Sequence, residues 1–382
     1  MSFRFVLAGG GTAGHINPAI AIGEYILSRQ PEAEALYIGR KGGMEEELVP
    51  ASGFRFEGIE VQGFSRSVSW QGLKNNAATV KKAMTAQRDA MKLLRDFQPD
   101  ICIGTGGYVS GPVLRAAARL KIPYIIHEQN AFPGVTNKLL AKHAACVMLA
   151  MPAAKDHFKG HIRFAETGNP VREEILTARR DECRKKMGLD ERPVILSFGG
   201  SLGAKVVNEA VADIIARSAQ DGRYQHIHAY GRYGKWFPDL LREKGADLEK
   251  APHLDIREYI SDMPQCLAAA DVVIARAGAI TLSEIEVQGK PSILIPSPNV
   301  AENHQYHNAM SLASQGAAVV IEEKDLTPAR LTEEIDRLAS DPQKLKAYSE
   351  NARRMAINDA AARIYSIVIE VLSKKTRTEE VL

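Results

Sequence analysis

Residues 4–22 read RFVLAGGGTAGHINPAIAI: an apolar run, a glycine-rich turn and the start of an amphipathic segment. Gly9, Gly11 and Gly14 have the spacing G-x-G-x-x-G, which within a strand–turn–helix unit is typical of a dinucleotide-binding fold. The stretch therefore predicts a parallel α/β architecture, and it raises the question of whether a nicotinamide cofactor binds at this turn.

Short apolar runs alternate with longer amphipathic segments along the whole chain. Runs such as EALYIG (34–39) and IPYIIHE (122–128) are typical of buried strands, and the segments between them are typical of helices on both faces of a parallel sheet. The pattern begins again with RPVILSFGG (192–200), after TGNPVR (167–172) has supplied Gly, Asn and Pro. Because 382 residues suffice for two domains, we predict an α/β protein of two Rossmann-like halves.

Composition narrows the class of protein. A net charge of +3 is too small to indicate nucleic-acid binding, and we expect none. The four cysteines lack zinc-ligand spacing, which favours reduced thiols and a cytoplasmic location. We expect no signal peptide in MSFRFVLAGG, and no uncharged apolar run reaches the roughly 18 residues of a membrane-spanning helix. Any membrane contact should therefore be peripheral.

The opening turn fits a nicotinamide cofactor poorly. An acidic residue should follow the second strand to bind the ribose 2′-hydroxyl, but that strand ends at Arg40 and Lys41, where an arginine could suit NADP instead. His15 is the larger objection, because this position stays small in dinucleotide sites so that the pyrophosphate can approach the helix. The imidazole could act as an acid–base group or could merely cap the helix, and the residues alone leave both interpretations open.

Two further strand ends in the first half carry notable turns. The stretch CIGTGGYVSGP (102–112) favours a tight strand–helix turn without a ligand, with phosphate binding as the alternative. The stretch IIHEQNAFPG (125–134) places His127, Glu128, Gln129 and Asn130 in succession. Ligands of open α/β sheets bind at the carboxyl ends of strands, so these side chains indicate a binding loop.

The second half has a matching glycine turn in FGGSLGAK (198–205). Its backbone amides, the hydroxyl of Ser201 and the dipole of the following helix suit a diphosphate group. The signature G-K-[ST] is absent, so the turn is not a P-loop. No histidine crowds this turn, which makes it the better phosphate candidate.

Two later segments could bind the rest of a nucleotide sugar. In ARAGAITLSE (275–284), Glu284 could accept both hydroxyls of a ribose, or it could close a capping box with Thr281. In ENHQYHN (302–308), amide and imidazole groups suit sugar hydroxyls, and a solvated loop of the same composition is the alternative. We expect no metal site, because His304 and His307 lack a third ligand.

A basic and apolar stretch covers residues 64–95, where seven Lys or Arg residues accompany one acid, Asp89. Apolar residues such as Trp70 and Met84 are interleaved with them. This composition suits an anionic membrane surface, while a helix with a solvated basic face is the alternative. The basic residues are Arg66, Lys74, Lys81, Lys82, Arg88, Lys92 and Arg95.

Taken together, these stretches resemble the MurG family, the bacterial N-acetylglucosaminyltransferases of peptidoglycan synthesis. The resemblance runs from about residue 3 to residue 360, and seven motifs occur in the expected order, which makes a chance match very improbable. The motifs are GGGTAGHINPAIAI, GTGGYVSGP, HEQNAFPGVTNK, TGNPVR, GGSLGA, ARAGAITLSEIEVQGKP and ENHQYHNA.

The resemblance implies a GT-B fold, with two Rossmann-like domains whose parallel sheets face each other across a cleft. It implies an inverting, metal-independent transfer of GlcNAc from UDP-GlcNAc to the 4-hydroxyl of MurNAc in lipid I, which gives lipid II and UDP without a cofactor. The domain that receives the acceptor and faces the membrane would cover residues 1–166 and 356–382, and the donor domain residues 167–355. The enzyme would lie at the cytoplasmic face of the bacterial cell membrane as a peripheral protein.

The same resemblance implies roles for individual residues. In the second half it places Arg172 and Ile260 beside the uracil, Ser201 at the diphosphate, Glu284 at the ribose, Gln305 at the GlcNAc hydroxyls, and Ala279, Ile280, Thr281, Leu282 and Ser283 along the donor turn. In the first half it places Thr12, Ala13, Gly14, His15 and Asn130 at the reacting centre, with Tyr108 and Glu128 as further members of that wall.

His15 and Glu128 are the two candidates for the general base, and histidine suits proton transfer near neutral pH. The chain departs from the family pattern at Ala13, where glycine is usual, and at His304, where glutamine is usual. Three alternatives lie in other classes: a UDP-GlcNAc 2-epimerase, an NAD(P) oxidoreductase and a non-catalytic nucleotide-sugar sensor.

Overall fold

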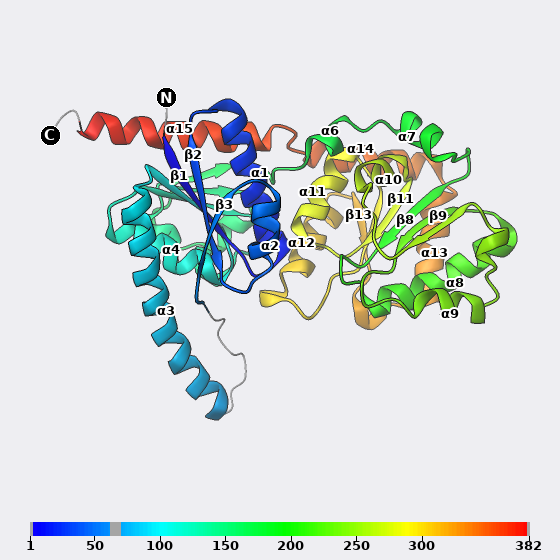
Figure 1. Ribbon diagram of the computed structural model, residues 1–382. Helices are drawn as coiled ribbons and strands as arrows, with labels where there is room; N and C mark the ends of the chain where they lie inside the picture. The colour runs from blue at the N-terminus through cyan, green and yellow to red at the C-terminus, as the bar shows by residue number, and fades with distance from the viewer. Residues whose placement is uncertain (1–2, 62–69, 380–382) are drawn as a thin grey trace. The chain divides into compact units, whose positions relative to one another are not determined.

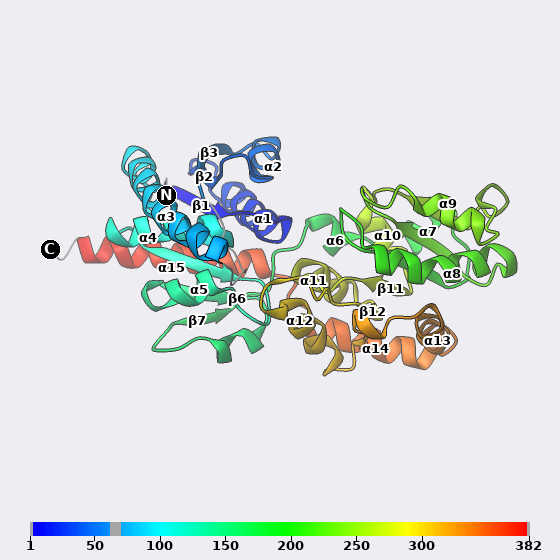
Figure 2. The ribbon, with the colours of Figure 1, turned by 90° about the horizontal axis from the view of Figure 1, so that it is seen from below.

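The computed structural model describes residues 3–61 and 70–379, with side chains described for residues 3–61 and 84–374. The chain folds into two compact units (Figure 1). Unit 1 comprises Met1–Pro170 and Asp359–Leu382, and unit 2 comprises Val171–Asn358. Each unit contains one parallel sheet, and helices cover the faces of that sheet (Figures 1 and 2).

The sheet of unit 1 has seven parallel strands in the order β3-β2-β1-β4-β5-β6-β7. The strand order reverses between β1 and β4, and the carboxyl ends of strands at such a switch point are where open α/β sheets bind ligands. The strands are β1 (Arg4–Gly9), β2 (Glu34–Arg40), β3 (Arg55–Ile59), β4 (Ile101–Gly106), β5 (Tyr124–Glu128), β6 (Cys146–Leu149) and β7 (Phe164–Glu166).

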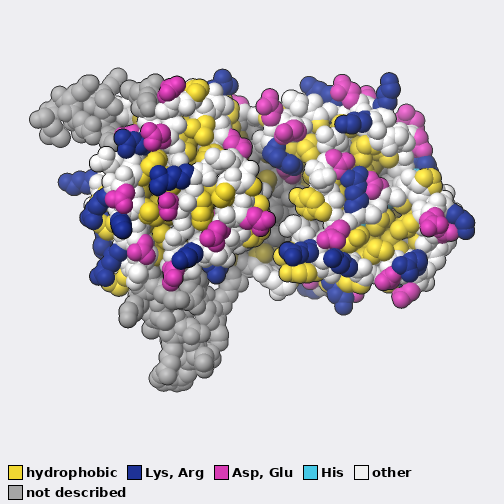
Figure 3. Space-filling model, viewed as in Figure 1, with side chains coloured by type: hydrophobic (Ala, Val, Ile, Leu, Met, Phe, Trp, Pro, Cys, Tyr) yellow, Lys and Arg dark blue, Asp and Glu magenta, His cyan; other side chains and the backbone are white. Residues whose placement is uncertain are grey.

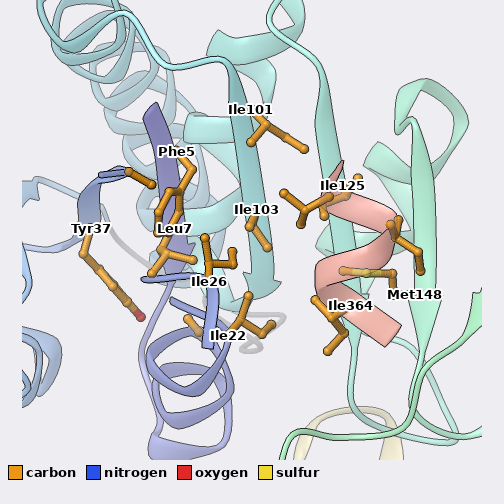
Figure 4. Packing of buried hydrophobic residues seen from close by; sticks show 14 of the residues in the cluster. Phe5, Leu7, Ile22, Ile26, Tyr37, Ile101, Ile103, Ile125, Met148 and Ile364 are labelled. Carbon is orange, nitrogen blue, oxygen red and sulfur yellow. The ribbon is translucent and has the colours of Figure 1, made fainter. Parts of the chain in front are cut away.

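Strand β1 shows why the central strands read as continuous apolar runs. Phe5 and Leu7 belong to the buried cluster on one face of the sheet, and Val6 and Ala8 belong to the cluster on the other face. Side chains alternate between the two faces of a strand, so a strand that is covered on both faces must be apolar throughout. Figure 4 shows the first of these clusters.

Helices α1 and α15 cover one face of this sheet, and α3 and α4 cover the other. Although α15 lies at the end of the chain, Ile364 packs in the same cluster as Phe5 (Figure 4), and Tyr365 Oη accepts a hydrogen bond of 2.8 Å from Gln30 Nε2 beyond the end of α1. The helices of unit 1 are α1 (Ala13–Arg29), α2 (Glu45–Ala51), α3 (Trp70–Phe97), α4 (Gly107–Arg119), α5 (Val135–Leu140), the short 3-10 helices η1 (Ala141–His143) and η2 (Pro152–His157), and α15 (Ala360–Glu379).

The sheet of unit 2 has six parallel strands in the order β10-β9-β8-β11-β12-β13. Its switch point lies between β8 and β11, so the turns that follow these two strands occupy the position at which ligands are expected. The strands are β8 (Val194–Phe198), β9 (Gln225–Ala229), β10 (Leu254–Arg257), β11 (Val272–Ala275), β12 (Ser292–Leu294) and β13 (Ala318–Val320).

The main core of unit 2 joins α8, α9 and α13 to β8, β11 and β12. Val207, Val211 and Ile214 of α8 follow a spacing of three and four residues and are all buried, as expected of a helix that lies on a sheet. The helices of unit 2 are α6 (Glu173–Thr177), α7 (Arg180–Met187), α8 (Lys205–Asp221), α9 (Phe237–Glu243), η3 (Leu248–Lys250), α10 (Met263–Ala269), α11 (Ala279–Gln288), η4 (Ala301–Asn303), α12 (His304–Ala313), η5 (Glu323–Asp325), α13 (Pro328–Ala339) and α14 (Pro342–Met355).

The apolar runs predicted the central strands of both sheets, but they did not predict β3, β7 and β10. All three are edge strands, which are covered less completely and therefore carry a weaker apolar signal. The two glycine turns differ in where the following helix begins: α1 begins at Ala13, inside the G-x-G-x-x-G stretch, whereas α8 begins only at Lys205, after the glycine turn has closed.

The surface carries mixed charge. Figure 3 shows Lys and Arg side chains interspersed with Asp and Glu side chains on the face that it views in both units. In the part of α3 whose side chains are described, Ala86, Ala90 and Leu94 are buried, whereas Arg88 and Lys92 are exposed. The rest of the basic stretch, residues 64–83, lies outside the described side chains.

Candidate active-site residues in each unit

The first glycine turn connects β1 to α1 at the switch point of unit 1. Thr12 is the residue before the helix, so His15 lies in the first helical turn, half-buried. Its ring nitrogen Nδ1 lies 3.2 Å from Oε1 of Gln129, just beyond β5, and its carbonyl accepts a hydrogen bond of 2.7 Å from the Thr105 hydroxyl. The imidazole therefore bonds to a neighbouring strand end and does not cap its own helix.

Ala13 causes no backbone strain at the first turn. It is the first residue of α1, and it is not among the described residues that have a positive φ. The positive φ of the turn, +84°, falls at Gly11, where glycine adopts it freely. The methyl group that distinguishes this chain from the family pattern is thus accommodated.

The glycines after β4 make room for the first turn. Gly106 and Gly107 have φ values of +108° and +80°, and a Cβ on Gly107 would lie 2.1 Å from the carbonyl oxygen of Gly10. A Cβ on Gly106 would lie 3.0 Å from the imidazole of His15. These contacts account for the glycine pattern of CIGTGGYVSGP as a packing requirement, without a phosphate. Tyr108, the next residue, is half exposed.

Glu45 is fully buried beneath the first glycine turn. Its Oε1 accepts a hydrogen bond of 2.9 Å from the amide of Arg40, and its Oε2 lies 3.5 Å from the amide nitrogen of Gly11. A Cβ on Gly10 would lie 2.1 Å from Oε1, so a larger residue there would displace the carboxyl group of Glu45. An acidic group against this turn disfavours a pyrophosphate there, and a carboxyl group bonded to backbone amides is not available to a ribose.

The binding loop predicted after β5 is held together by Glu128. Its Oε1 accepts from the backbone and side-chain nitrogens of Asn130 at 3.0 and 3.1 Å, and its Oε2 accepts from Gly134 N at 3.1 Å and from Asn137 Nδ2 at 2.8 Å. The side chain of Glu128 is almost fully buried. Glu128 therefore shapes the loop that carries Asn130, and all four of its hydrogen bonds are already committed.

The second glycine turn lies between β8 and α8 at the switch point of unit 2. Gly203 (φ +83°) packs against the next strand end, where a Cβ would lie 2.2 Å from the carbonyl oxygen of Tyr230. Ser201 and Leu202 are exposed, and the first turn of α8 contains no acidic residue. Exposed amides at a helix N-terminus without a neighbouring acid are suited to an anionic ligand.

Helix α11 begins at Ala279, directly after Gly278. Thr281 is therefore already inside the helix and makes no capping hydrogen bond, so the capping-box interpretation of Thr281 and Glu284 is wrong. Leu282 and Ser283 are buried, and the Ser283 hydroxyl donates to the carbonyl of Ala279. Both residues therefore face the interior of the unit.

Glu284 lies one turn into α11 and is mostly shielded, with its side chain 13% exposed. Arg172, just before α6, approaches it with 3.6 Å between Nη2 and Oε1. Burial raises the pKa of Glu284, and the Arg172 guanidinium partly offsets that rise. Glu284 thus offers carboxylate oxygens as hydrogen-bond acceptors, and the neighbouring Arg172 cation favours the ionised form of that carboxyl group.

The remaining predicted donor residues lie at other loops of unit 2. Ile260 is buried between β10 and α10. Gln305 is the second residue of α12, and its Oε1 accepts from the amide of Ser297 at 2.9 Å. The neighbouring His304 Nδ1 lies 2.8 Å from the carbonyl of Ala301, to which it donates. That bond ties His304 to its own loop, and the bond to Ser297 fixes the oxygen end of the Gln305 amide.

Three residues near the predicted site of unit 1 did not enter the sequence prediction with a role: Glu45, Gln129 and Thr105. In the sequence, Gln129 is one polar residue among four. Its role depends on the hydrogen-bond partners of its amide oxygen and its amide nitrogen, which only the fold determines. Glu45 lies five residues beyond the end of β2, in a run of three glutamates, and no pattern within that run distinguishes the buried one.

Residues 3–61 and 70–379 contain no cluster of three or more His, Cys, Asp and Glu side chains that could hold a metal ion. Among the same residues, no helix combines the length and apolarity needed to span a bilayer. The four cysteines are buried free thiols, and burial raises the pKa of Cys266 to about 12.

Family models match both units of the chain. The N-terminal domain of glycosyltransferase family 28 matches residues 5–149, and the C-terminal domain of glycosyltransferase family 28 matches residues 194–364. Together with two parallel sheets that each carry candidate residues at the switch point, these matches define a glycosyltransferase of the GT-B class.

Relatives narrow the class further. A protein of Acetivibrio thermocellus, named UDP-N-acetylglucosamine–N-acetylmuramyl-(pentapeptide) pyrophosphoryl-undecaprenol N-acetylglucosamine transferase, is 45% identical over 97% of this chain and 99% of its own length. The crystal structure of Acinetobacter baumannii MurG has a TM-score of 0.76 and 28% identity, and the match covers 97% of this chain and all of that one. The chain belongs to the MurG family of glycosyltransferases.

The fold is shared more widely than the family. The UDP-GlcNAc 2-epimerase of Neisseria meningitidis, solved with UDP-GlcNAc bound, has a TM-score of 0.65 at 13% identity, over 98% of this chain and all of that chain. At that identity the likeness concerns the fold alone. It explains why an epimerase is the natural alternative on architecture, and it gives that alternative no support at the level of sequence.

Proposed function

We propose that the protein transfers GlcNAc from UDP-GlcNAc to the 4-hydroxyl of MurNAc in lipid I, with inversion at the sugar C1, to give lipid II and UDP. The observation that carries the proposal is the contrast between the two switch points. One places an imidazole beside the glycine turn, and the other leaves a glycine turn and a helix N-terminus open to an anion. The 45% identity to a transferase whose name states this donor and acceptor supports it.

Unit 2, residues 171–358, is assigned to the donor. The amides of the Gly199–Gly203 turn, the hydroxyl of Ser201 and the N-terminus of α8 would bind the diphosphate. Glu284 would accept the ribose hydroxyls, because it lies in α11 at the same switch point and its pairing with Arg172 favours the ionised form. The backbone near Ile260 and the Arg172 side chain would lie beside the uracil, and Gln305 would bind the GlcNAc hydroxyls.

Unit 1 is assigned to the acceptor and to proton transfer. Of the two candidate bases, His15 fits better, because its ring is only half-buried and has a nitrogen, Nε2, on the side away from Gln129. Protonating Glu128 would disturb four hydrogen bonds that hold the loop around Asn130. We therefore assign Glu128 to the architecture of the acceptor side and His15 to proton removal.

The chemistry is a single displacement. The acceptor oxygen forms a bond to C1 of GlcNAc while the bond from C1 to the diphosphate oxygen breaks, and UDP leaves with the electron pair. The acceptor proton passes to His15 Nε2. Negative charge that grows on the diphosphate is stabilised by the amides of the second glycine turn and by the dipole of α8, so the residues assigned here complete the reaction without a metal or cofactor.

We also propose that the enzyme works as a peripheral protein at the cytoplasmic face of the bacterial cell membrane, attached through residues 64–95 to anionic lipid. Seven basic residues and one acid in this stretch support attachment. Charge reversal at Lys81 and Lys82 should weaken binding to vesicles that contain anionic lipid. Unchanged binding would contradict this attachment.

The transfer itself is tested by incubating the purified protein with labelled UDP-GlcNAc and a lipid I analogue. Label that enters the lipid fraction with release of UDP supports the transferase. Epimerised UDP-sugar would support the isomerase, and donor binding without turnover would support a sensor. The oxidoreductase alternative predicts a change in nicotinamide absorbance that the transferase does not.

A further inference from the structure

A glutamine side chain connects two histidines in unit 1. Gln129 is almost fully buried, and its Nε2 lies 2.8 Å from the carbonyl oxygen of Thr105 and 3.0 Å from the carbonyl oxygen of His127. Carbonyl oxygens can only accept hydrogen bonds, so the nitrogen end of the amide must be the end that faces them. The other end, Oε1, is therefore the atom that meets the ring of His15.

This orientation determines which nitrogen of His15 carries the proton. The amide oxygen of Gln129 is an acceptor only, so the ring nitrogen 3.2 Å away, Nδ1, must be the donor. In the neutral imidazole Nε2 then has no proton and presents a lone pair. Gly106 lies against the same side of the ring, since a Cβ there would lie 3.0 Å from Nδ1 and Cε1.

The ring of the second histidine, His127, also has one nitrogen that donates and one that does not. His127 is fully buried, and its Nε2 lies 2.9 Å from the carbonyl oxygen of Gly168, to which it must donate. Its Nδ1 therefore carries no proton and lies 3.1 Å from Nε2 of Gln129, whose two hydrogens face the carbonyl oxygens of Thr105 and His127. Burial lowers the pKa of His127, which keeps the ring neutral and preserves this pattern of one donor and one acceptor. An unprotonated Nδ1 on His127 is compatible with the nitrogen end of the Gln129 amide beside it, so both neighbours of that amide agree on its orientation.

We propose that Gln129 is a positioning residue that fixes His15 in the Nδ1–H tautomer, so that Nε2 is the atom that removes the proton from the sugar hydroxyl. The inference rests on the proposed function of His15 as the base. When Nε2 takes up the proton, Nδ1 keeps its hydrogen and Gln129 keeps accepting it, so the ring need not turn during the reaction. A neutral amide orients the imidazole without adding a negative charge beside it.

The tautomer can be measured without turnover. Protein with ¹⁵N-labelled histidine side chains is examined by NMR at alkaline pH, where imidazole groups are neutral, and the His15 signals are assigned as those lost in His15→Ala. We expect the wild-type His15 to show a protonated Nδ1 and an unprotonated Nε2. A wild-type ring protonated at Nε2 would overturn the proposal, and this result needs no variant of Gln129 to fold.

The variant Gln129→Met removes the amide at similar side-chain length. We expect His15 to lose its preference for the Nδ1–H form and kcat for GlcNAc transfer to fall on the order of 10-fold to 100-fold, with an unchanged KM for UDP-GlcNAc. The matched control is Gln30→Met, which removes a glutamine amide bonded to Tyr365 in the same unit, at the opposite end of α1 from His15. In Gln30→Met, both the tautomer of His15 and the kcat for GlcNAc transfer should match those of the wild type.

The outcomes separate this inference from the proposed function. If His15→Ala keeps normal turnover while wild-type His15 is protonated at Nδ1, the base assignment fails and the tautomer stands. If His15→Ala is inactive and Gln129→Met keeps both the Nδ1–H form and a wild-type kcat, the role of Gln129 fails and the base assignment stands. A loss of donor affinity in Gln129→Met with unchanged kcat would also overturn positioning, since it would show a binding role.

Discussion

The two glycine turns have the same sequence character and the same place in the fold, yet their surroundings differ in charge. Each follows the first strand of its sheet at the switch point and leads into a long helix. At the first turn a buried acid, Glu45, lies against Gly10, and the imidazole of His15 enters the first turn of the helix. At the second turn Ser201 is exposed and the helix begins without an acid.

This difference separates the function of a glycine turn from its geometry. Glycine spacing lets a strand pass into a helix with its backbone close to a neighbouring strand end, as the contact of Gly107 with Gly10 and that of Gly203 with Tyr230 both show. Whether an anion binds depends on the side chains that surround the amides. The first turn is lined with a carboxyl group and an imidazole of the protein itself, whereas at the second turn Ser201 and Leu202 are exposed and no acid lies in the first turn of the helix.

The sharpest test of the first turn is His15→Ala, for which we expect kcat to fall on the order of 10²-fold to 10⁴-fold, the usual contribution of a general base. Affinity for UDP-GlcNAc, measured by calorimetry, should stay at the wild-type value, because the donor is assigned to unit 2. His143→Ala, which removes an exposed imidazole of the same unit, is the control. Near-normal turnover of His15→Ala would remove His15 from the role and return attention to Glu128.

Glu45→Ala tests whether the acid beneath the first turn is structural. We expect the free energy of unfolding to fall by about 1–3 kcal/mol, because the amide of Arg40 loses its acceptor and a cavity opens beside Gly10. Chemical denaturation measures the change, and Glu45→Gln, which keeps the shape and one acceptor oxygen, should lose less. If Glu45→Ala has the stability of the wild type but binds UDP-GlcNAc more weakly, Glu45 has a binding role, and the proposed difference between the two turns is wrong.

The sequence predicted the architecture well because the central strands are buried on both faces, and such strands must be apolar throughout. It also located both switch-point turns, since each follows a strongly apolar strand. It predicted the edge strands β3, β7 and β10 poorly, because their partial exposure permits polar residues. Glycine turns carry little information on where the first helical hydrogen bond forms, so they do not predict that α1 begins at Ala13 and α8 at Lys205.

The roles of polar residues were harder to predict than their presence. The sequence predicts a polar loop at Glu128, Gln129 and Asn130. The role of each side chain depends on which atoms lie within about 3 Å of it, and no spacing in the sequence encodes those partners. Thr281 and Glu284 have capping-box spacing, and only the helix start at Ala279 shows that they do not form one. Glu45 could not be distinguished from its neighbours, because burial of one acid depends on contacts made with residues far away in sequence.

Ser201→Asp tests the second turn by giving it the acid that the first turn already has. We expect affinity for UDP to fall on the order of 10-fold to 100-fold, since a carboxylate beside the diphosphate repels it at short range. Ser201→Asn is the matched control of similar size without the charge, and it should lose much less affinity. Calorimetric titration with UDP measures both, and equal losses in the two variants would show that charge does not distinguish the turns.

The smallest expected effect concerns Glu284 and depends on pH. If the ionised carboxylate accepts the ribose hydroxyls, as proposed, affinity for UDP-GlcNAc is present above the pKa of Glu284 and is lost as the pH falls through it. Burial raises that pKa, so KM for UDP-GlcNAc should begin to rise at a higher pH than it would for an exposed glutamate.

Two variants test this pH dependence. Glu284→Gln should raise KM on the order of 10-fold and abolish the rise of KM at acidic pH. Arg172→Ala removes the cation that opposes the shift, so it should move the onset to still higher pH. KM measured across pH for the three proteins decides the matter, and an acid-side rise that survives in Glu284→Gln would assign the titration to another group.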